Sequence, residues 1–227
     1  MTNLNFFNEN GYVIIDKVFS EKDCDDLIKL AINLNKKDNF IPIMNIHNLS
    51  EVVKEYMSNK TIIKFINKYF NSKACGLQTE YFFMPPGTKG FSPHQDNTYV
   101  KAESDSFISA WIALTNVSSE NGGLIIWPGS HKENQLKLIE YEENPIENQD
   151  PNARKMTSVI PDKYMALSPN ITKGSVMFLH SWLVHASNSN KSKENRNALL
   201  CTYIKKGADF RAGNYAKREA FELNENT

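Results

Sequence analysis

The sequence has no excess of charge of either sign, because its 26 lysine and arginine residues equal its 26 aspartate and glutamate residues. Proteins that bind nucleic acid or a membrane surface electrostatically normally carry a basic patch or a basic balance. We therefore expect neither nucleic acid nor membrane among its partners. No uninterrupted apolar run is long enough to cross a bilayer. The first residues show no basic segment followed by an apolar one, so no signal peptide is expected.

Cysteine is scarce, and its placement is informative. Cys24, Cys75 and Cys201 are far apart and form no CxxC pair. Disulfide frameworks and zinc knuckles need even or closely spaced cysteines, so the pattern favours reduced thiols in a cytoplasmic protein. The sequence also lacks internal repeats, low-complexity tracts and a glycine-rich phosphate loop. What remains is a chain of 227 residues, 41% hydrophobic and 23% charged, which suits one globular domain with a sizeable core.

The first third of the chain predicts one strand and several helices. Residues 11–18 (GYVIIDKV) are rich in β-branched residues and predict a short strand. Ser20 and Asp23 have the spacing of a capping box at the start of a helix. The apolar residues of that helix recur at helical spacing and predict a buried face: Cys24, Leu27, Ile28, Ala31 and Leu34. Residues 51–57 and 61–70 predict two further helices.

From residue 76 the apolar pattern changes to that of strands. Short runs rich in β-branched and aromatic residues are separated by turn residues. These runs are residues 77–84, 107–114, 124–127, 163–167, 174–179, 182–186 and 198–205. Asn121-Gly122-Gly123 predicts a hairpin before the run at 124–127. Many short strands predict a jelly roll or barrel, so we expect a mainly β protein with flanking α-helices.

Residues 132–161 interrupt this pattern with a long stretch rich in Glu, Asn, Gln and Pro. A loop of this length inside a compact domain is usually functional or disordered. We interpret it as an insertion or a lid over one mouth of the barrel, with a solvated loop as the alternative. The expected organisation is one domain: an N-terminal strand and helices (1–75), a jelly-roll core (76–206) and a charged, peripheral tail (207–227).

His94 and Asp96, in the stretch Ser-Pro-His-Gln-Asp, have the spacing of a metal clamp. In an extended strand, residues i and i+2 point to the same face, so an imidazole and a carboxylate can bind one cation together. A second histidine on a neighbouring strand would complete a 2-His-1-carboxylate triad, which is diagnostic of non-haem Fe(II) oxygenases. For the motif alone, a surface turn with two polar side chains is the alternative.

His185 is the candidate for the second histidine. It ends an apolar run, Ser187 follows two residues later, and Arg196 opens the next strand after a polar loop. In an antiparallel return the two ends of such a loop lie side by side, so Arg196 can approach the same cavity as His185. A guanidinium there can bind the distal carboxylate of a keto acid that chelates the metal, and Ser187 can add a hydroxyl.

Taken in order, these motifs resemble the phytanoyl-CoA dioxygenase family of Fe(II)/2-oxoglutarate-dependent oxygenases. The matching segments are 6–19 (FFNENGYVIIDKVF), 93–97 (PHQDN), 111–114 (WIAL), 120–131 (ENGGLIIWPGSH) and 174–187 (GSVMFLHSWLVHAS), followed by Arg196. The resemblance implies a double-stranded β-helix, cupin-like, with the metal near one open mouth. It implies three iron ligands: His94, Asp96 and His185. It implies that 2-oxoglutarate is bound by Arg196, with Ser187 and Gln78 beside it.

The resemblance also bears on the other histidines. His131 matches a structural turn, and His47 is expected to be a bystander in a polar connection. His180 is expected to face the substrate or the metal surroundings, or else to be structural. Many relatives have a lysine near Met84, and its absence here puts a co-substrate contact at that position in doubt.

The implied function is a dioxygenase that uses Fe(II), 2-oxoglutarate and O2 to hydroxylate an unactivated C–H bond, releasing succinate and CO2. Relatives that halogenate lack the carboxylate ligand, so Asp96 favours hydroxylation, while desaturation and ring closure stay open. The expected substrate contacts are Asn97, Tyr99, Trp111 and His180. Because no clustered basic patch suits a CoA diphosphate, we expect a small polar metabolite or a biosynthetic intermediate.

Two other classes of function stay open. A non-catalytic jelly-roll binding module would need neither the metal triad nor Arg196. A zinc- or manganese-dependent hydrolase or isomerase of cupin type could use the same two histidines and aspartate, but it would leave Ser187 and Arg196 without a role. The sequence makes no prediction about the oligomeric state.

Overall fold

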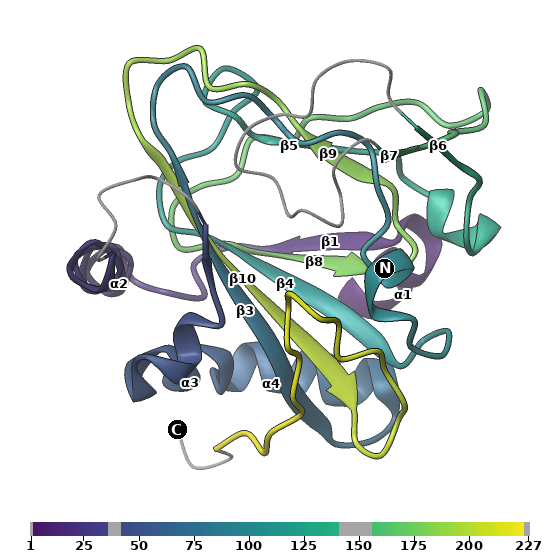
Figure 1. The fold of residues 1–227 in the computed structure, drawn as a ribbon, viewed down its shortest axis with the longest axis horizontal. Coiled ribbons are helices and arrows are strands. Elements are labelled where there is room, and N and C mark those ends of the chain that lie inside the picture. Colours follow the sequence, from purple (N-terminus) through teal and green to yellow (C-terminus); the bar gives the residue numbers. More distant parts are fainter. Residues whose placement is uncertain (1, 36–41, 141–155, 225–227) are drawn as a thin grey trace.

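A six-stranded antiparallel sheet runs through the centre of the molecule, in the order β1-β8-β4-β10-β3-β2 (Figure 1). The structure, a computed structural model, describes residues 2–35, 42–140 and 156–224. The strands of this sheet are β1 (Tyr12–Ile15), β2 (Ile43–Met44), β3 (Ala74–Met84), β4 (Phe107–Ala113), β8 (Val176–His180) and β10 (Arg196–Lys205).

A second, smaller sheet faces the large one. It pairs β5 (Leu124–Ile126) with β9 (His185–Ser187). Single bridges extend it on both sides, from Ile126 to Leu167 and from His185 to His94. Together the two sheets confirm the predicted double-stranded β-helix, in a mainly β protein with flanking helices.

Helices α3 (Glu51–Met57) and α4 (Lys60–Phe70) cover the outer face of the large sheet, on the side away from β5 and β9 (Figure 1). The other described helices are α1 (Asn3–Asn10), α2 (Glu21–Leu34) and the single turn α5 (Asn97–Val100), with 3-10 turns η1 (Ile46–Asn48) and η2 (Ser130–Glu133). Among the described helices, none has both the length and the hydrophobicity that crossing a membrane requires.

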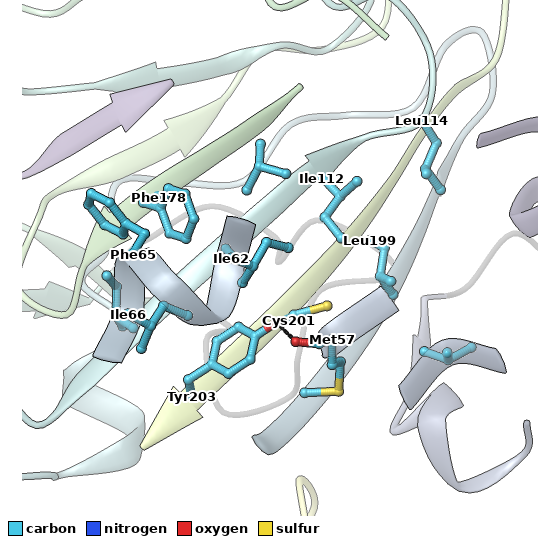
Figure 2. Close-up of a cluster of buried hydrophobic side chains, with 14 of the residues drawn as sticks. Met57, Ile62, Phe65, Ile66, Ile112, Leu114, Phe178, Leu199, Cys201 and Tyr203 are labelled. Carbon is cyan, nitrogen blue, oxygen red and sulfur yellow. Dashed lines mark hydrogen bonds between the residues drawn. The ribbon is translucent and has the colours of Figure 1, made fainter. Parts of the chain in front are cut away.

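Alternation along the central strands places apolar side chains in separate clusters on the two faces of the large sheet. The outward residues of β4 and β10 join the helices in one cluster, shown in Figure 2: Ile112, Leu199, Cys201 and Tyr203 pack with Met57, Ile62, Phe65 and Ile66. The hydroxyl of Tyr203 donates to the carbonyl of Met57 over 3.0 Å. The inward residues form a second cluster: Trp111, Ala113, Met177, Leu179 and Ala198. Because successive side chains of a strand point to opposite faces, the same strands hold the helices and face the interior of the roll.

The predicted capping box at the start of α2 is confirmed. The Oγ of Ser20 accepts from the backbone N–H of Asp23 over 3.1 Å, and the Asp23 carboxylate accepts from the Ser20 N–H over 2.9 Å. On the predicted apolar face, Cys24, Leu27 and Ala31 are buried, while Ile28 and Leu34 are half-buried. The two helices predicted at 51–57 and 61–70 are α3 and α4.

Some strand predictions are wrong. The turn at 121–123 does not join a hairpin, because β5 pairs with β9 while β4 pairs with β8 and β10. Residues 163–167 form no strand, and only Leu167 makes a bridge. Periodicity shows that a segment is extended, but the choice of partner depends on closure of the whole roll. Helix α1 was not predicted, because its few apolar residues give only a weak helical pattern.

The predicted insertion is described only at its ends. There β6 (Leu138–Glu140) and β7 (Met156–Ser158) pair as an antiparallel ladder. Residues 141–155 lie outside the described part of the chain, so a lid remains a prediction.

The tail after residue 206 is mostly exposed, and it contacts the barrel at a few residues. Phe221 bridges to Gly76, and its ring stacks on His47 with centroids 4.8 Å apart. Ala216 and Arg218 are buried. About a third of the tail residues are charged, and apolar side chains such as Phe221 and Ala216 lie between them and make its contacts with the barrel. His47, expected to be a bystander, is a buried packing residue with its Nδ1 2.7 Å from the Thr79 hydroxyl.

Candidate active site

The interior of the roll holds a cavity lined by both sheets. Three alternating residues of β3 face it, namely Gln78, Glu80 and Phe82. Leu200 and Thr202 of β10 face it as well. The cavity encloses about 900 Å³, its open mouth included. His94, Asp96 and His185 also line it. The other lining residues are mainly aromatic and aliphatic: Phe91, Tyr99, Val100, Phe107, Trp111, Leu124, Leu179, Ala186, Ser187, Arg196 and Arg218.

His94, Asp96 and His185 meet in this cavity. One ligand atom from each lies within 4.8 Å of the others. The Nε2 atoms of His94 and His185 lie 3.7 Å and 3.4 Å from Oδ1 of Asp96. The backbones of the two histidines pair directly, with N–H to carbonyl distances of 2.9 and 3.0 Å. This bridge brings two distant segments of the chain together at one point.

Backbone carbonyls orient both imidazole rings. The Nδ1 of His94 lies 2.7 Å from the carbonyl of Ser92, and the Nδ1 of His185 lies 3.1 Å from the carbonyl of Leu183. A carbonyl can only accept, so each Nδ1 carries the proton and each Nε2 presents its lone pair. A metal-binding histidine needs this arrangement, with one nitrogen fixed by a backbone acceptor and the other free to coordinate.

Asp96 is held as an anion on the third side of the site. Ser109 of β4 donates its hydroxyl to Oδ2 over 2.7 Å, which leaves Oδ1 facing the two imidazoles. Burial raises the pKa of Asp96, but His185, His94 and the Ser109 hydrogen bond together lower it more, so the pKa lies below its ordinary value. The carboxylate is therefore ready to bind a cation at neutral pH.

The backbone of the motif differs from the predicted extended strand. Only His94 makes a strand bridge, and Asp96 has helical dihedral angles (φ −57°, ψ −38°) as the N-cap of α5. The predicted pairing of His94 and Asp96 in one site still occurs, because the turn brings the carboxylate back toward the imidazole. The prediction assumed an extended backbone at Asp96, whereas the observed backbone there is helical.

Gln95, between the two ligands, points away from the cavity and is fully buried. Its Nε2 donates to the carbonyls of Asn134 and Trp182, each over 2.7 Å, and its Oε1 accepts from the N–H of Leu136 over 2.8 Å. One side chain thus joins the metal-binding segment, the start of the insertion and the turn before His185.

Arg196 lies in the same cavity, buried, with its guanidinium 5.4 Å from the ring centre of Trp111. Its Nη2 donates to the carbonyl of Gly122 over 2.8 Å and contacts the sulfur of Met84. Its Nε has no hydrogen-bond partner among the described residues. Burial lowers the pKa of Arg196 to about 9. A buried cation with an unused N–H is suited to binding an anion.

The route by which Arg196 reaches the site differs from the prediction. β9 and β10 belong to different sheets, so the two ends of the loop between them do not pair as an antiparallel return. Arg196 instead pairs with Met84 at the end of β3. The predicted shared cavity of Arg196 and His185 is present, but closure of the roll creates it.

Gly122 supports Arg196 through its own backbone. Its φ of +90° is in the region that favours glycine, and a Cβ there would come within 2.9 Å of the Met84 Cε. The positive φ and the close approach to Met84 explain why the Asn-Gly-Gly turn has a glycine at position 122.

Ser187 faces the cavity from β9. Its Oγ accepts from the N–H of Phe91 over 2.9 Å, which leaves its own proton to donate. A Cβ at Gly90 would collide with the carbonyl of Ser187, so the two segments can approach only because residue 90 is glycine. Gln78 also lines the cavity.

The structure separates the four expected substrate contacts. Tyr99 and Trp111 line the cavity. Asn97 is buried and closes its own loop, through hydrogen bonds with the backbone of Ala102. His180 is absent from the lining, and its Nε2 lies 3.0 Å from the carboxylate of Asp105. Asn97 and His180 therefore support the fold around the site.

His131 is buried in the turn after β5, as expected for a structural residue. Its Nε2 lies 3.1 Å from the carbonyl of Asn8, and its ring lies beside that of His180.

Sequence reasoning missed four residues at or beside the site: Glu80, Gln95, Ser109 and Arg218. Ser109 is a lone hydroxyl in an apolar strand, a signal that could have been used. Glu80 alternates with Gln78 on β3, which also could have been noticed. Arg218 lies in a tail without periodicity, and nothing in the sequence connects it with the cavity.

The fold and the site together define a class of protein: a jelly roll with a 2-His-1-carboxylate candidate iron site and a buried arginine in the same cavity. The family model for phytanoyl-CoA dioxygenase matches residues 30–198, more than half of the chain. The chain belongs to the phytanoyl-CoA dioxygenase family, as the sequence motifs indicated.

Named relatives agree with this assignment. Phytanoyl-CoA dioxygenase 1 of Oryza sativa subsp. japonica is 26% identical over 219 residues, covering 96% of this chain and 72% of the relative. Phytanoyl-CoA dioxygenase of Arabidopsis thaliana is 28% identical, covering 86% of this chain and 66% of the relative. The chain thus spans about two thirds to three quarters of their length.

Solved structures show the same fold. The epimerase SnoN from nogalamycin biosynthesis, in complex with Fe3+, alpha ketoglutarate and nogalamycin RO, has a TM-score of 0.77 at 16% identity, covering 98% of this chain and 94% of SnoN. EctD from S. alaskensis with bound Fe has a TM-score of 0.73 at 18% identity, covering 97% of this chain and 85% of EctD. The predicted cofactors, iron and 2-oxoglutarate, agree with what such structures contain.

The cytoplasmic location stays a prediction. Cys24, Cys75 and Cys201 are all buried and free. The related bovine enzyme is named a peroxisomal phytanoyl-CoA dioxygenase.

Proposed function

We propose that this protein is an Fe(II)- and 2-oxoglutarate-dependent dioxygenase that hydroxylates an unactivated C–H bond. One observation carries the proposal: a buried arginine with an unused N–H shares a cavity with two imidazoles and a carboxylate whose donor atoms converge. His94, Asp96 and His185 would hold the iron. Arg196 would bind the distal carboxylate of 2-oxoglutarate.

The donor set fits this metal. Two neutral imidazoles and one carboxylate leave coordination positions open for a chelating keto acid and O2. When bound, Fe(II) with 2-oxoglutarate supplies the oxidation of a C–H bond by O2, one oxygen atom entering the product and the other entering succinate as CO2 leaves.

The protein's own residues orient the reactants and limit water. Arg196, held by Gly122 and Trp111, and Ser187, held by Phe91, offer N–H and O–H donors to a carboxylate. Ser109 keeps Asp96 ionised and fixed. The aromatic lining excludes water from the reacting centre.

A small substrate with some polar groups fits the rest of the cavity. Gln78, Glu80, Tyr99 and Thr202 supply polar groups among apolar ones. We therefore propose a small polar metabolite or biosynthetic intermediate, as the sequence suggested. An EctD structure that contains 5-hydroxyectoine shows that this fold can hold such a molecule.

Ring closure and epimerisation are alternative outcomes of the same oxidation. Solved structures with this fold include the carbocyclase SnoK and the epimerase SnoN. Product analysis by mass distinguishes them, because hydroxylation adds one oxygen atom to the substrate and the other two do not.

The test is an anaerobic titration of Fe(II)-loaded protein with 2-oxoglutarate, followed in the visible spectrum. A keto acid that chelates Fe(II) gives a charge-transfer band, which binding elsewhere does not produce. We expect the band in the wild type, its loss in His185→Ala, and a weaker affinity in Arg196→Met. His180→Gln, a buried histidine outside the cavity, is the control and should keep the band.

A folded, iron-loaded wild type without the band would refute the co-substrate assignment. Tight zinc or manganese binding with hydrolase or isomerase activity would then favour the metal-dependent hydrolase or isomerase. Absence of metal binding would favour a non-catalytic module.

A further inference from the structure

The C-terminal tail contributes a side chain to the cavity. Arg218 is 9% exposed and lines the same cavity as His94 and Asp96. It lies 22 residues after Arg196, beyond the last strand of the roll. The family model ends at residue 198, so this part of the site lies outside the matched region.

The tail holds α5 by the carbonyls at its C-terminal end. The Nη1 of Arg218 donates to the carbonyl of Tyr99 over 3.4 Å and to that of Arg211 over 3.3 Å. Arg211 donates its Nε to the same Tyr99 carbonyl over 2.8 Å, and its backbone N–H to the carbonyl of Val100 over 2.6 Å. Two cations thus meet the negative end of this helical turn, where a positive charge is favourable.

α5 in turn determines where Asp96 lies. Asp96 is its N-cap, and its carbonyl accepts from the N–H groups of Tyr99 and Val100 over 3.0 and 3.3 Å. A helix of one turn has too few internal hydrogen bonds to be stable alone. Its conformation therefore depends on external contacts. At its C-terminal end these are the Asn97–Ala102 hydrogen bonds and the contacts of Arg211 and Arg218 from the tail.

Arg218 and Asp96 also line the same cavity. The tail thus brings a cation that contacts α5 to the cavity that contains the Asp96 carboxylate.

We propose that Arg218, with Arg211, is a positioning residue for the metal site: it fixes α5 and so directs the Asp96 carboxylate toward the imidazoles. The proposal rests on the proposed metal centre and extends it to the tail. Arg218 acts through Asp96 and needs no contact with the reacting atoms.

The test uses Co(II) alone as the probe, without 2-oxoglutarate. Metal-free full-length protein is titrated with Co(II), and the visible absorption of bound Co(II) gives both the dissociation constant and the coordination signature. The variants are Arg218→Met, Arg218→Lys and Lys217→Gln. Lys217 is exposed and adjacent in sequence, so its substitution removes the same charge without touching α5.

We expect Arg218→Met to weaken Co(II) binding by about tenfold or more, as is usual when a residue that orients a ligand is lost. Its Co(II) spectrum should change shape, because the carboxylate is less well fixed. Arg218→Lys should recover part of the affinity, and Lys217→Gln should stay within about twofold of the wild type. Urea unfolding of the metal-free proteins shows whether each variant is folded.

Folded Arg218→Met that binds Co(II) within about twofold of the wild type, with the same spectrum, overturns the proposal. If Arg218→Met does not fold, Arg218→Lys decides, because the shorter lysine side chain does not bring its nitrogen to the position of Nη1 beside the two carbonyls. Wild-type affinity in that variant would also overturn the proposal. A wild type that binds Co(II) but gives no band with Fe(II) and 2-oxoglutarate refutes the proposed function and leaves this proposal intact.

Discussion

Replacing Gln95 with leucine should destabilise the protein and loosen its metal site together. The side chain is fully buried and makes three hydrogen bonds, to the backbones of Asn134, Leu136 and Trp182. Leucine is similar in volume but can make none of them. Two carbonyls and one N–H would lose their partner.

The magnitude follows from the surroundings of those three groups. An unsatisfied buried polar group costs about 1–3 kcal/mol. Asn134 is exposed, while Leu136 and Trp182 are half-buried, so water can replace part of what is lost. We therefore expect a loss of about 3 kcal/mol in the free energy of unfolding. For a chain of this length that lowers Tm by roughly 6–12 °C.

The assay is urea or thermal unfolding of the metal-free protein, paired with a Co(II) titration. Gln135→Leu is the matched control. Gln135 lies between Asn134 and Leu136, which Gln95 contacts, and it carries the same side chain but is exposed. It should stay within about 0.5 kcal/mol of the wild type. Gln95→Leu that unfolds like the control and binds Co(II) like the wild type would refute the view that this amide holds the metal-binding segment in place.

The remaining predictions concern the anion site and pH. Arg196→Met should weaken 2-oxoglutarate binding by about 100-fold, because charge-assisted hydrogen bonds contribute about 1.5–3 kcal/mol each. The anaerobic titration measures this affinity, and a wild-type value would contradict the role of Arg196 in binding the carboxylate. Gly122→Ala should weaken 2-oxoglutarate binding and lower stability by about 1–2 kcal/mol, since φ is +90° and a Cβ would press on Met84; unchanged unfolding would contradict this. Burial, with the nearby His180, lowers the pKa of His131 to about 4, below the ordinary 6.5. The unfolded chain therefore takes up this proton first, so stability is complete above pH 6.5 and falls as the pH drops toward 4. Between pH 7 and pH 5, urea unfolding should show a loss of stability that is larger in the wild type than in His131→Asn by about 1–2 kcal/mol. An equal loss in the two proteins would contradict this.

The sequence predicted which residues meet in the candidate metal site, because their order along the chain and their neighbours are informative. His94, Asp96 and His185 were recognisable from their spacing and from the strands around them. Arg196 was recognisable from its position after the last histidine. The backbone conformation at these residues was predicted less well. Asp96 begins a helical turn and not a strand, and Arg196 pairs with the end of β3 and not with the segment of His185.

The supporting residues were harder to predict, because they act through tertiary contacts. Ser109 is 13 residues from Asp96 in sequence, and Arg218 is 119 residues from the Tyr99 carbonyl it binds. Strand pairing failed for a similar reason. A pattern of alternating residues shows which face is buried but not which strand lies beside it, so the turn at 121–123 suggested a hairpin that the roll does not form.

His94 and His185 come from distant segments of the chain and lie side by side. A metal ion bound by both side chains would therefore crosslink these segments. The two residues are 91 positions apart (185 − 94), so the ion would close a loop of that length much as a disulfide does. An ion that binds only the folded chain stabilises it by about 4 kcal/mol when its concentration is 1,000 times its dissociation constant. Metal supply would then set the lifetime of the protein as well as its activity.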